Sequence, residues 1–286
     1  SLACLRSLTT AQLLKAQTSL TTFQLSQLFK GQLGDFLIWA PQIDPATAPV
    51  QPSQAAIAKP VIVGTNRNEG NLFVPSSPIS ALVYAAVVDR LFGAADTARI
   101  LTRLRYAVLP GDNAQRLANL INDYLFVCAN RAVLKRTTGP AYAYSFTHVP
   151  SYAVWPASPK PCQPVADGGE GRVCHAFELP FVFRNPVAVS TVATPDGLVP
   201  PGIDFTTGER TLVNRLTSYW TSFAANDRPS SLTALIPWPK FRASGTRLVL
   251  DTALSTTQDA SLNCPLWDSI GYDLGDADFG IFPKPN

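Results

Sequence analysis

The sequence predicts an α/β protein with a mostly parallel central sheet flanked by helices. Three observations lead to this class. Short strand-like runs alternate along the chain with longer stretches of helical periodicity. Hydrophobic residues make up 46% of the 286 residues, which is enough for a sizeable core. The run Pro60–Gly64 (PVIVG) has β-branched residues on both faces, as in parallel strands that are covered on both sides.

The N-terminal segment predicts two short helices before Gly31. Apolar residues recur there at three- and four-residue steps, and pairs of threonines offer N-caps. The recurring residues are Leu8, Leu13, Leu14, Leu20, Phe23, Leu25 and Leu28. From Phe36 to Lys59 four prolines predict a loop that leads into the strand Pro60–Gly64.

After that strand, periodicity predicts further helices and two more strands. Another loop, rich in Pro, Gly and Ser, extends to Val173. The predicted helices are Ile79–Leu91, Ala95–Tyr106, Asp112–Thr137, a short piece near Phe177–Phe183, Glu209–Ala225 and a last one near Asp259–Ile270. The predicted strands are Ala141–Thr147 and Arg247–Asp251.

Charge and hydropathy exclude two classes of partner. Charged residues are 15% of the chain, and the 23 Lys and Arg against 20 Asp and Glu form no basic block, so nucleic acid is not expected as a partner. No run of 18 apolar residues is present, so no membrane span is expected.

Five cysteines are an odd number, so one has no intrachain partner if the others pair. Metal ligation is the competing use, but no C-x-x-C occurs and only two histidines could complete a tetrahedral site. Disulfides are therefore favoured, and they imply a secreted or otherwise extracytoplasmic protein. The chain has no methionine, so we expect it to be a processed or cut segment.

Glu69 and His175 are the candidate catalytic residues. Glu69 directly follows the strand Pro60–Gly64, and in open α/β sheets functional groups lie beyond the carboxyl ends of strands. An acid in a polar loop is also commonly solvated and inert. His175 lies on a loop beside Cys174, and a structural histidine is the alternative. His148 ends a predicted strand before a proline and is interpreted as a turn cap.

As a pair, Glu69 and His175 fit the orienting acid and the general base of a hydrolase, in the chain order acid then histidine. Such a hydrolase also needs a nucleophile upstream. No G-x-S-x-G nucleophile elbow occurs anywhere in the 286 residues.

Five separate motifs together resemble the type-B carboxylesterase and cholinesterase family of α/β-hydrolases. They occur in the family order, and CHAFELPFVF looks closer to the bacterial and fungal carboxylesterases than to acetylcholinesterases. The resemblance implies that residues 1–286 are the C-terminal half of an α/β-hydrolase fold, a portion of one carboxylesterase domain. The motifs are VIVGTNRNEGNLF (61–73), AYAYSFTHVPS (141–151), CHAFELPFVF (174–183), RLTSYWTSFA (215–224) and IPWPKF (236–241).

The resemblance also implies roles for individual residues. Glu69 matches the family's catalytic acid, and His175 matches the base that exchanges a proton with the serine and the leaving alcohol. Leu37, Leu72 and Phe73 resemble residues that line the family's acyl pocket, although plain core packing would explain them equally well.

For the cysteines, the resemblance implies two intrachain disulfides and one interchain link. Cys128 and Cys264 match the family's long-range disulfide, and Cys162 and Cys174 flank the loop before His175. Cys4 resembles the second cysteine of a small family loop whose first cysteine lies upstream, so an interchain disulfide is expected there.

We therefore expect the C-terminal chain of a two-chain or nicked serine carboxylesterase that hydrolyses small carboxylic esters through a Ser-His-Glu triad. An N-terminal chain would supply the G-x-S-x-G serine, and no cofactor or metal is expected. A non-catalytic, cholinesterase-like interaction module is the alternative of a different class, and a truncated fragment is a third. A module freed from catalysis has no physical need for both Glu69 and His175, which favours the enzyme.

Overall fold

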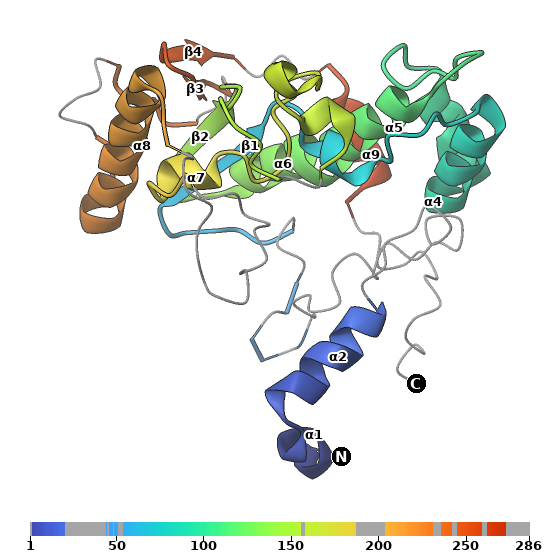
Figure 1. The fold of residues 1–286 in the computed structure, drawn as a ribbon, viewed down its shortest axis with the longest axis horizontal. Coiled ribbons are helices and arrows are strands. Elements are labelled where there is room, and N and C mark those ends of the chain that lie inside the picture. The colour runs from blue at the N-terminus through green and yellow to red at the C-terminus, as the bar shows by residue number, and fades with distance from the viewer. Residues whose placement is uncertain are drawn as a thin grey trace.

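The computed structural model describes residues 2–20, 44, 46–47, 49–50, 54–155, 158–186, 204–230, 236–241, 245–258 and 262–272. A sheet with strand order β1-β2-β3-β4 lies at the centre of these residues (Figure 1). The first three strands are parallel and β4 runs antiparallel to β3, so the predicted class is confirmed. The strands are β1 (Val61–Asn66), β2 (Ala141–Phe146), β3 (Arg247–Leu250) and β4 (Ser255–Thr257).

The three predicted strands are present, with two differences at the sheet. β1 extends two residues past its predicted end, because Thr65 and Asn66 continue the register against Ser145 and Phe146. β4 was not predicted, since its three residues are polar and exposed and carry no apolar alternation. At the other side of the sheet, Gly64 lets β1 approach β2 closely: a Cβ there would lie 2.2 Å from the Tyr144 ring.

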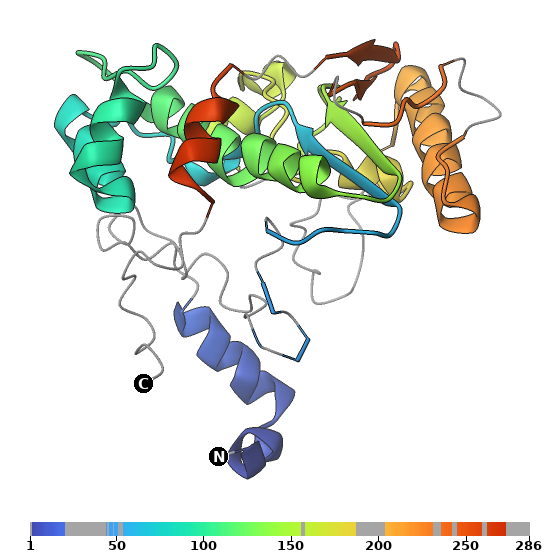
Figure 2. The same cartoon turned by 180° about the vertical axis from the view of Figure 1, so that it is seen from behind.

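Helices cover the sheet, and three apolar clusters are buried among the described residues. One cluster joins α4, α5, η3 and α9, and a second joins β2 and β3 to α7, α8 and the His175 loop. A small third cluster joins Leu134 of α6 to Ala141 and Ala143 of β2. Seen from behind, α6 runs along β1, which it contacts (Figure 2). The elements are α4 (Ala81–Leu101), α5 (Ala114–Ile121), η3 (Asn122–Val127), α6 (Cys128–Arg136), α7 (Leu179–Val182), α8 (Thr207–Asn226) and α9 (Cys264–Ile270).

One pair of helix predictions is confirmed, and two other predictions need correction. The helices predicted over Ile79–Leu91 and Ala95–Tyr106 are both present: they meet at a kink at Gly93 (φ 74°), carry the single label α4, and the second of them ends at Leu101 rather than Tyr106. The single helix predicted over Asp112–Thr137 is α5 and α6 with one π-helical stretch, η3, between them. The last helix begins at Cys264 rather than near Asp259, because Pro265 at its first turn favours a helix start there.

Two helices precede the loop region as predicted, α1 (Leu2–Ser7) and α2 (Thr10–Leu20). The remaining apolar residues of that prediction, Phe23, Leu25 and Leu28, lie outside the described residues. α1 and α2 lie apart from the sheet and its helices (Figure 1).

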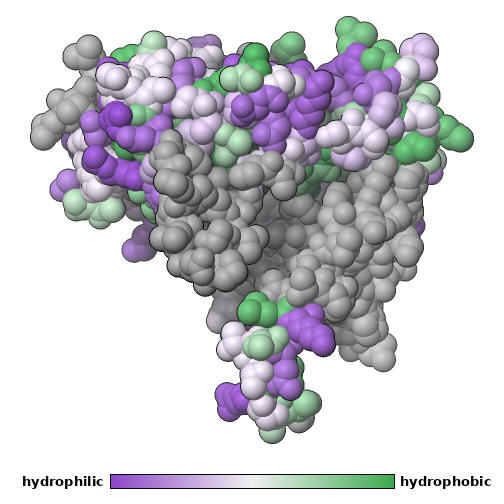
Figure 3. Space-filling model, in the orientation of Figure 1, coloured by the Kyte–Doolittle hydropathy of each residue, from purple (hydrophilic) through white to green (hydrophobic). Residues whose placement is uncertain are grey.

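The surface mixes hydrophilic and hydrophobic residues over the face seen in Figure 3. This agrees with the low share of charged residues, 15%. Some large apolar side chains are well exposed, among them Leu104 and Leu262 at 88% each. Among the helices that the structure describes, none is long and apolar enough to cross a membrane.

Candidate active site

Glu69 is a buried acid at the start of η2 (Glu69–Phe73), three residues beyond the end of β1. Its side chain is 5% exposed, and Oε1 accepts a hydrogen bond of 2.6 Å from the main-chain N–H of Asn66. The turn packs directly on α5, since a Cβ at Gly70 would lie 2.0 Å from the carbonyl oxygen of Ala118. Glu69 is therefore not a solvated loop residue.

His175 lies on a loop that is joined to the acid turn. The main-chain N–H of Asn68 donates to the carbonyl oxygen of Val173 at 2.8 Å, and the N–H of Val173 donates to Oδ1 of Asn68 at 3.1 Å. Cys174 is bonded to Cys162, which ties the loop down immediately before the histidine. The contacts between Asn68 and Val173 bring together two segments that are 105 residues apart in the sequence.

The backbone around His175 is also specific. Indole Nε1 of Trp155 donates to the carbonyl oxygen of His175 at 2.9 Å. The next residue, Ala176, has φ 67°, in the left-handed region that residues with a Cβ rarely adopt. Backbone conformations of this kind are concentrated at functional sites.

Glu69 and His175 form an acid–histidine pair, with Oε2 of Glu69 2.7 Å from Nδ1 of His175. The imidazole is 41% exposed, whereas the carboxylate is buried. Burial of the ring disfavours its charged form, but the hydrogen bond and charge of Glu69, together with the charge of Glu178, outweigh this and raise the pKa of His175. Since Nδ1 is engaged, Nε2 is the nitrogen left to exchange a proton with a reactant.

Aromatic rings flank the imidazole. The ring centroids of Phe73 and Phe126 lie 5.3 and 5.0 Å from that of His175. Leu72, by contrast, packs against the apolar cluster of β2, β3, α7 and α8. Leu37 lies outside the described residues. Phe73 is thus the predicted pocket residue that the structure places beside the histidine.

Glu178 is a second carboxylate close to the pair, half-buried, which the sequence motifs did not single out. Its Oε2 accepts from Nδ2 of Asn66 at 2.5 Å, and its Oε1 accepts from the Tyr144 hydroxyl at 3.4 Å. Burial, with the nearby charge of Glu69, raises the pKa of Glu178. Its position three residues after His175 in CHAFELPF was the available signal.

His148 belongs to a different cluster. Its Nε2 lies 3.3 Å from Oε1 of Glu209 and its Nδ1 lies 3.2 Å from Oδ1 of Asp251, so it joins the end of β2 to α8 and β3. The same Glu209 accepts from the main-chain N–H and the hydroxyl of Ser151, at 2.7 and 2.8 Å. These contacts tie the chain after β2 to the start of α8, which agrees with the turn-capping interpretation.

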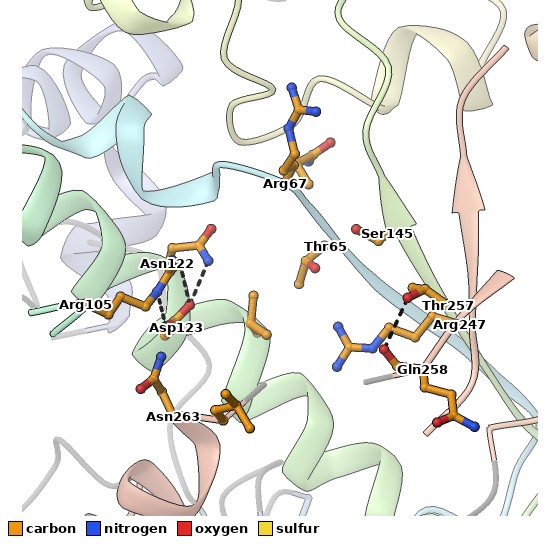
Figure 4. Close-up of a pocket in the computed structure, with 13 residues that line it drawn as sticks. Thr65, Arg67, Arg105, Asn122, Asp123, Ser145, Arg247, Thr257, Gln258 and Asn263 are labelled. Atoms are coloured by element: carbon orange, nitrogen blue, oxygen red, sulfur yellow. Dashed lines mark hydrogen bonds and ion pairs between the residues drawn. The ribbon is translucent and has the colours of Figure 1, made fainter. Parts of the chain in front are cut away.

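A polar pocket of about 360 Å³ lies between one face of the sheet and η3 (Figure 4). The arginines Arg67, Arg105 and Arg247 and the carboxylate of Asp123 are among its lining residues. In the part of the chain that the structure describes, no group of three or more His, Cys, Asp or Glu residues could hold a metal ion.

Both expected intrachain disulfides are present. Cys128 at the start of α6 is bonded to Cys264 at the start of α9, across 136 residues of sequence. Cys162 is bonded to Cys174, across 12 residues. Cys4 lies exposed in α1.

The sheet, the acid after β1 and the histidine that faces it define an α/β-hydrolase type of protein. A solved structure of a PNB esterase superposes on 92% of this chain with a TM-score of 0.60, at 23% sequence identity, and this chain covers 49% of it. That likeness confirms the fold.

The model of the carboxylesterase family matches residues 1–267, and the chain belongs to that family. The para-nitrobenzyl esterase of Bacillus subtilis is 25% identical over 263 residues, 89% of this chain and 47% of the relative. The crystal protein of Dictyostelium discoideum is 28% identical over 264 residues, 84% of this chain and 43% of the relative. The chain thus spans about half the length of the curated relatives it matches.

Proposed function

We propose that this chain supplies the acid and the base of a Ser-His-Glu triad that hydrolyses small carboxylic esters. The observation that carries the proposal is the 2.7 Å contact between buried Glu69 and partly exposed His175. The similarity to an esterase of Bacillus subtilis supports the reaction class. A non-catalytic module would not need a buried carboxylate that raises the pKa of an exposed imidazole.

In the proposed reaction, Nε2 of His175 takes the serine hydroxyl proton as the serine oxygen attacks the ester carbonyl. The imidazolium formed is stabilised by Glu69, and it returns the proton to the departing alcohol. A water molecule then attacks the acyl-serine while the same histidine takes its proton. The imidazolium passes this proton to the serine oxygen as the acyl bond breaks, which releases the carboxylic acid. Phe73 and Phe126 would form an apolar wall beside the reacting groups, with Leu72 and Leu37 further proposed pocket residues.

We infer that the serine and the oxyanion hole come from the rest of the domain, in a second chain or across a nick. Among the described residues β1 pairs only with β2, so its outer edge offers main-chain groups to a further strand. Exposed Leu262 at the polar pocket also offers an apolar side chain for burial. Cys4 is the proposed disulfide link, and the two disulfides favour an extracytoplasmic location.

Rates of p-nitrophenyl acetate hydrolysis by the assembled protein test the reaction. We expect His175→Asn to reduce kcat by about 10³- to 10⁴-fold, because the serine loses its base. The matched control is His148→Asn, which changes the only other histidine and is expected to retain most of the activity. Equal losses in the two variants would show that His175 acts only through folding.

Electrophoresis with and without reductant tests the two-chain arrangement. The 286-residue chain has a mass of 30.8 kDa, so a larger non-reduced band that yields this mass on reduction is expected. The larger band should disappear in the Cys4→Ser variant. One band of the same mass in both lanes, with no copurifying polypeptide, would contradict the two-chain arrangement.

A further inference from the structure

The π-helical stretch η3 starts at a residue that faces the acid turn. Asn122 is the first residue of η3, and its side chain is buried, with 5% of the residue exposed. π-Helical turns are rare and occur frequently at functional sites, because the extra residue shifts side chains to new directions.

Asn122 contacts the acid directly. Its Oδ1 accepts from the main-chain N–H of Glu69 at 2.9 Å, and its Nδ2 donates to Oδ1 of Asp123 at 2.9 Å. The donation to Asp123 fixes which end of the amide faces Glu69. The close approach of Gly70 to Ala118 of α5 holds the acid turn against the helix that leads into η3. The turn therefore has little freedom to move away from Asn122.

Asp123 accepts further hydrogen bonds from two residues, Arg105 and Tyr106. Nε of Arg105 and the hydroxyl of Tyr106 each donate to its Oδ2 at 2.6 Å. Figure 4 shows Asn122, Asp123 and Arg105 together on one wall of the polar pocket. The direction of the Asn122 amide is thus determined by a chain of hydrogen bonds that does not include the acid.

The same π-helical stretch also reaches the histidine. Phe126, four residues after Asn122, places its ring 5.0 Å from the imidazole of His175. One short segment therefore contacts both members of the acid–histidine pair. The charged groups that face the imidazole are Glu69 and Glu178, and neither belongs to η3.

We propose that Asn122 is a positioning residue for the acid–histidine pair, which holds the main chain of Glu69 so that its carboxylate meets Nδ1 of His175. The inference rests on the proposed catalytic use of that pair. Asn122 touches neither the histidine nor a reactant in this role. Asn122 acts through Glu69, and the π-helical backbone of η3 directs the Asn122 side chain towards the acid turn.

Proton NMR titration of the two histidines of this chain in the assembled protein tests the proposal, with their signals assigned from His148→Gln and His175→Gln variants. Asn122→Leu removes the acceptor at similar volume. We expect amide exchange at Glu69 to rise about tenfold, as the loss of one hydrogen bond predicts. We also expect His175 to titrate at lower pH than in the wild type, because its contact with Glu69 loosens.

Two variants separate positioning from stability. Asn122→Asp keeps the Oδ1 acceptor but places a second carboxylate beside Asp123. This variant should unfold at a lower urea concentration than the wild type, whereas the pKa of its His175 should be equal to or above the wild-type value. Asn130→Leu is the matched control, because Asn130 joins the same helical region to β1 through the carbonyl oxygen of Gly64 at 3.1 Å. It should lower stability without moving the His175 titration.

The proposal would be overturned if the pKa of His175 in Asn122→Leu equals that of the wild type while the stability falls as it does in Asn130→Leu. If Asn122→Leu does not fold, Asn122→Ser replaces it. Equal His175 titrations in Asn122→Ser and Asn122→Asp would then overturn the proposal. None of these measurements needs ester hydrolysis, so they remain decisive even if the proposed function fails.

Discussion

Glu209→Gln should reduce stability in a way that depends on pH. Glu209 is buried at the start of α8, where it completes a capping box with Thr206. Its carboxylate accepts from the main-chain N–H and the hydroxyl of Thr206, both at 2.8 Å, in addition to the two bonds from Ser151. Glutamine retains one acceptor oxygen and loses both the other and the charge.

The size of the loss follows from these contacts. Loss of a helix cap costs about 0.5–2 kcal/mol, and hydrogen bonds to a charged group contribute about 1.5–3 kcal/mol. We therefore expect Glu209→Gln to lower the free energy of unfolding by about 2–3 kcal/mol at pH 7.

The pH dependence has a definite sign. Burial opposes the charged form of Glu209, but hydrogen bonds from His148, Thr206 and Ser151 outweigh it and lower the pKa from 4.5 to about 2. Because the folded pKa lies below the unfolded one, the stabilisation is complete above about pH 4.5 and is lost as the pH falls towards 2. The deficit of the variant should shrink to about 1 kcal/mol at pH 3.

Urea unfolding followed by tryptophan fluorescence at pH 7 and pH 3 measures this difference. Glu170→Gln is the control, since Glu170 forms an exposed pair with Arg172 and its loss should cost below about 0.5 kcal/mol. A deficit of equal size at both pH values would refute the electrostatic reasoning, and so would a loss at pH 7 no larger than that of the control.

Three further predictions concern the site and its support. Glu178→Gln should lower the pKa of His175, seen by NMR, because one of the two nearby negative charges is removed; an unchanged titration would contradict this. Replacement of both Cys128 and Cys264 by serine should cost about 5 kcal/mol in urea unfolding, from closure of a loop of 136 residues, and a loss under 1 kcal/mol would count against that loop-closure estimate. Gly70→Ala should cost about 1–3 kcal/mol, because its Cβ meets backbone, and should also lower the His175 pKa; unchanged stability would refute the close packing.

The sequence predicted the three parallel strands of the sheet but not its exposed edge strand, β4. Short apolar runs between helical stretches identified β1, β2 and β3, and β-branched residues on both faces marked the run that became β1. β4 pairs through its backbone while its side chains are exposed, so no apolar pattern marks it. η3 keeps the helical periodicity of its neighbours, and the single extra residue per turn leaves no signal in composition.

The candidate site was predictable only in part. Glu69 and His175 came from motifs, and their contact became visible in the fold that joins Asn68 to Val173. Glu178 and Asn122 had no local signal of comparable strength. The role of each depends on a hydrogen bond to a residue far away in the sequence. The bond from Asn66 to Glu178 spans 112 residues, and the bond from Glu69 to Asn122 spans 53.

Fluorophosphonate labelling of the assembled protein tests most directly whether this chain supplies the acid and base of a serine esterase. The probe reacts with a serine only when a base activates it. We predict a label on a serine within G-x-S-x-G, lost by at least about 10³-fold in His175→Asn and retained in His148→Asn. A label that survives His175→Asn unchanged, or no label on the assembled wild type, would contradict the account.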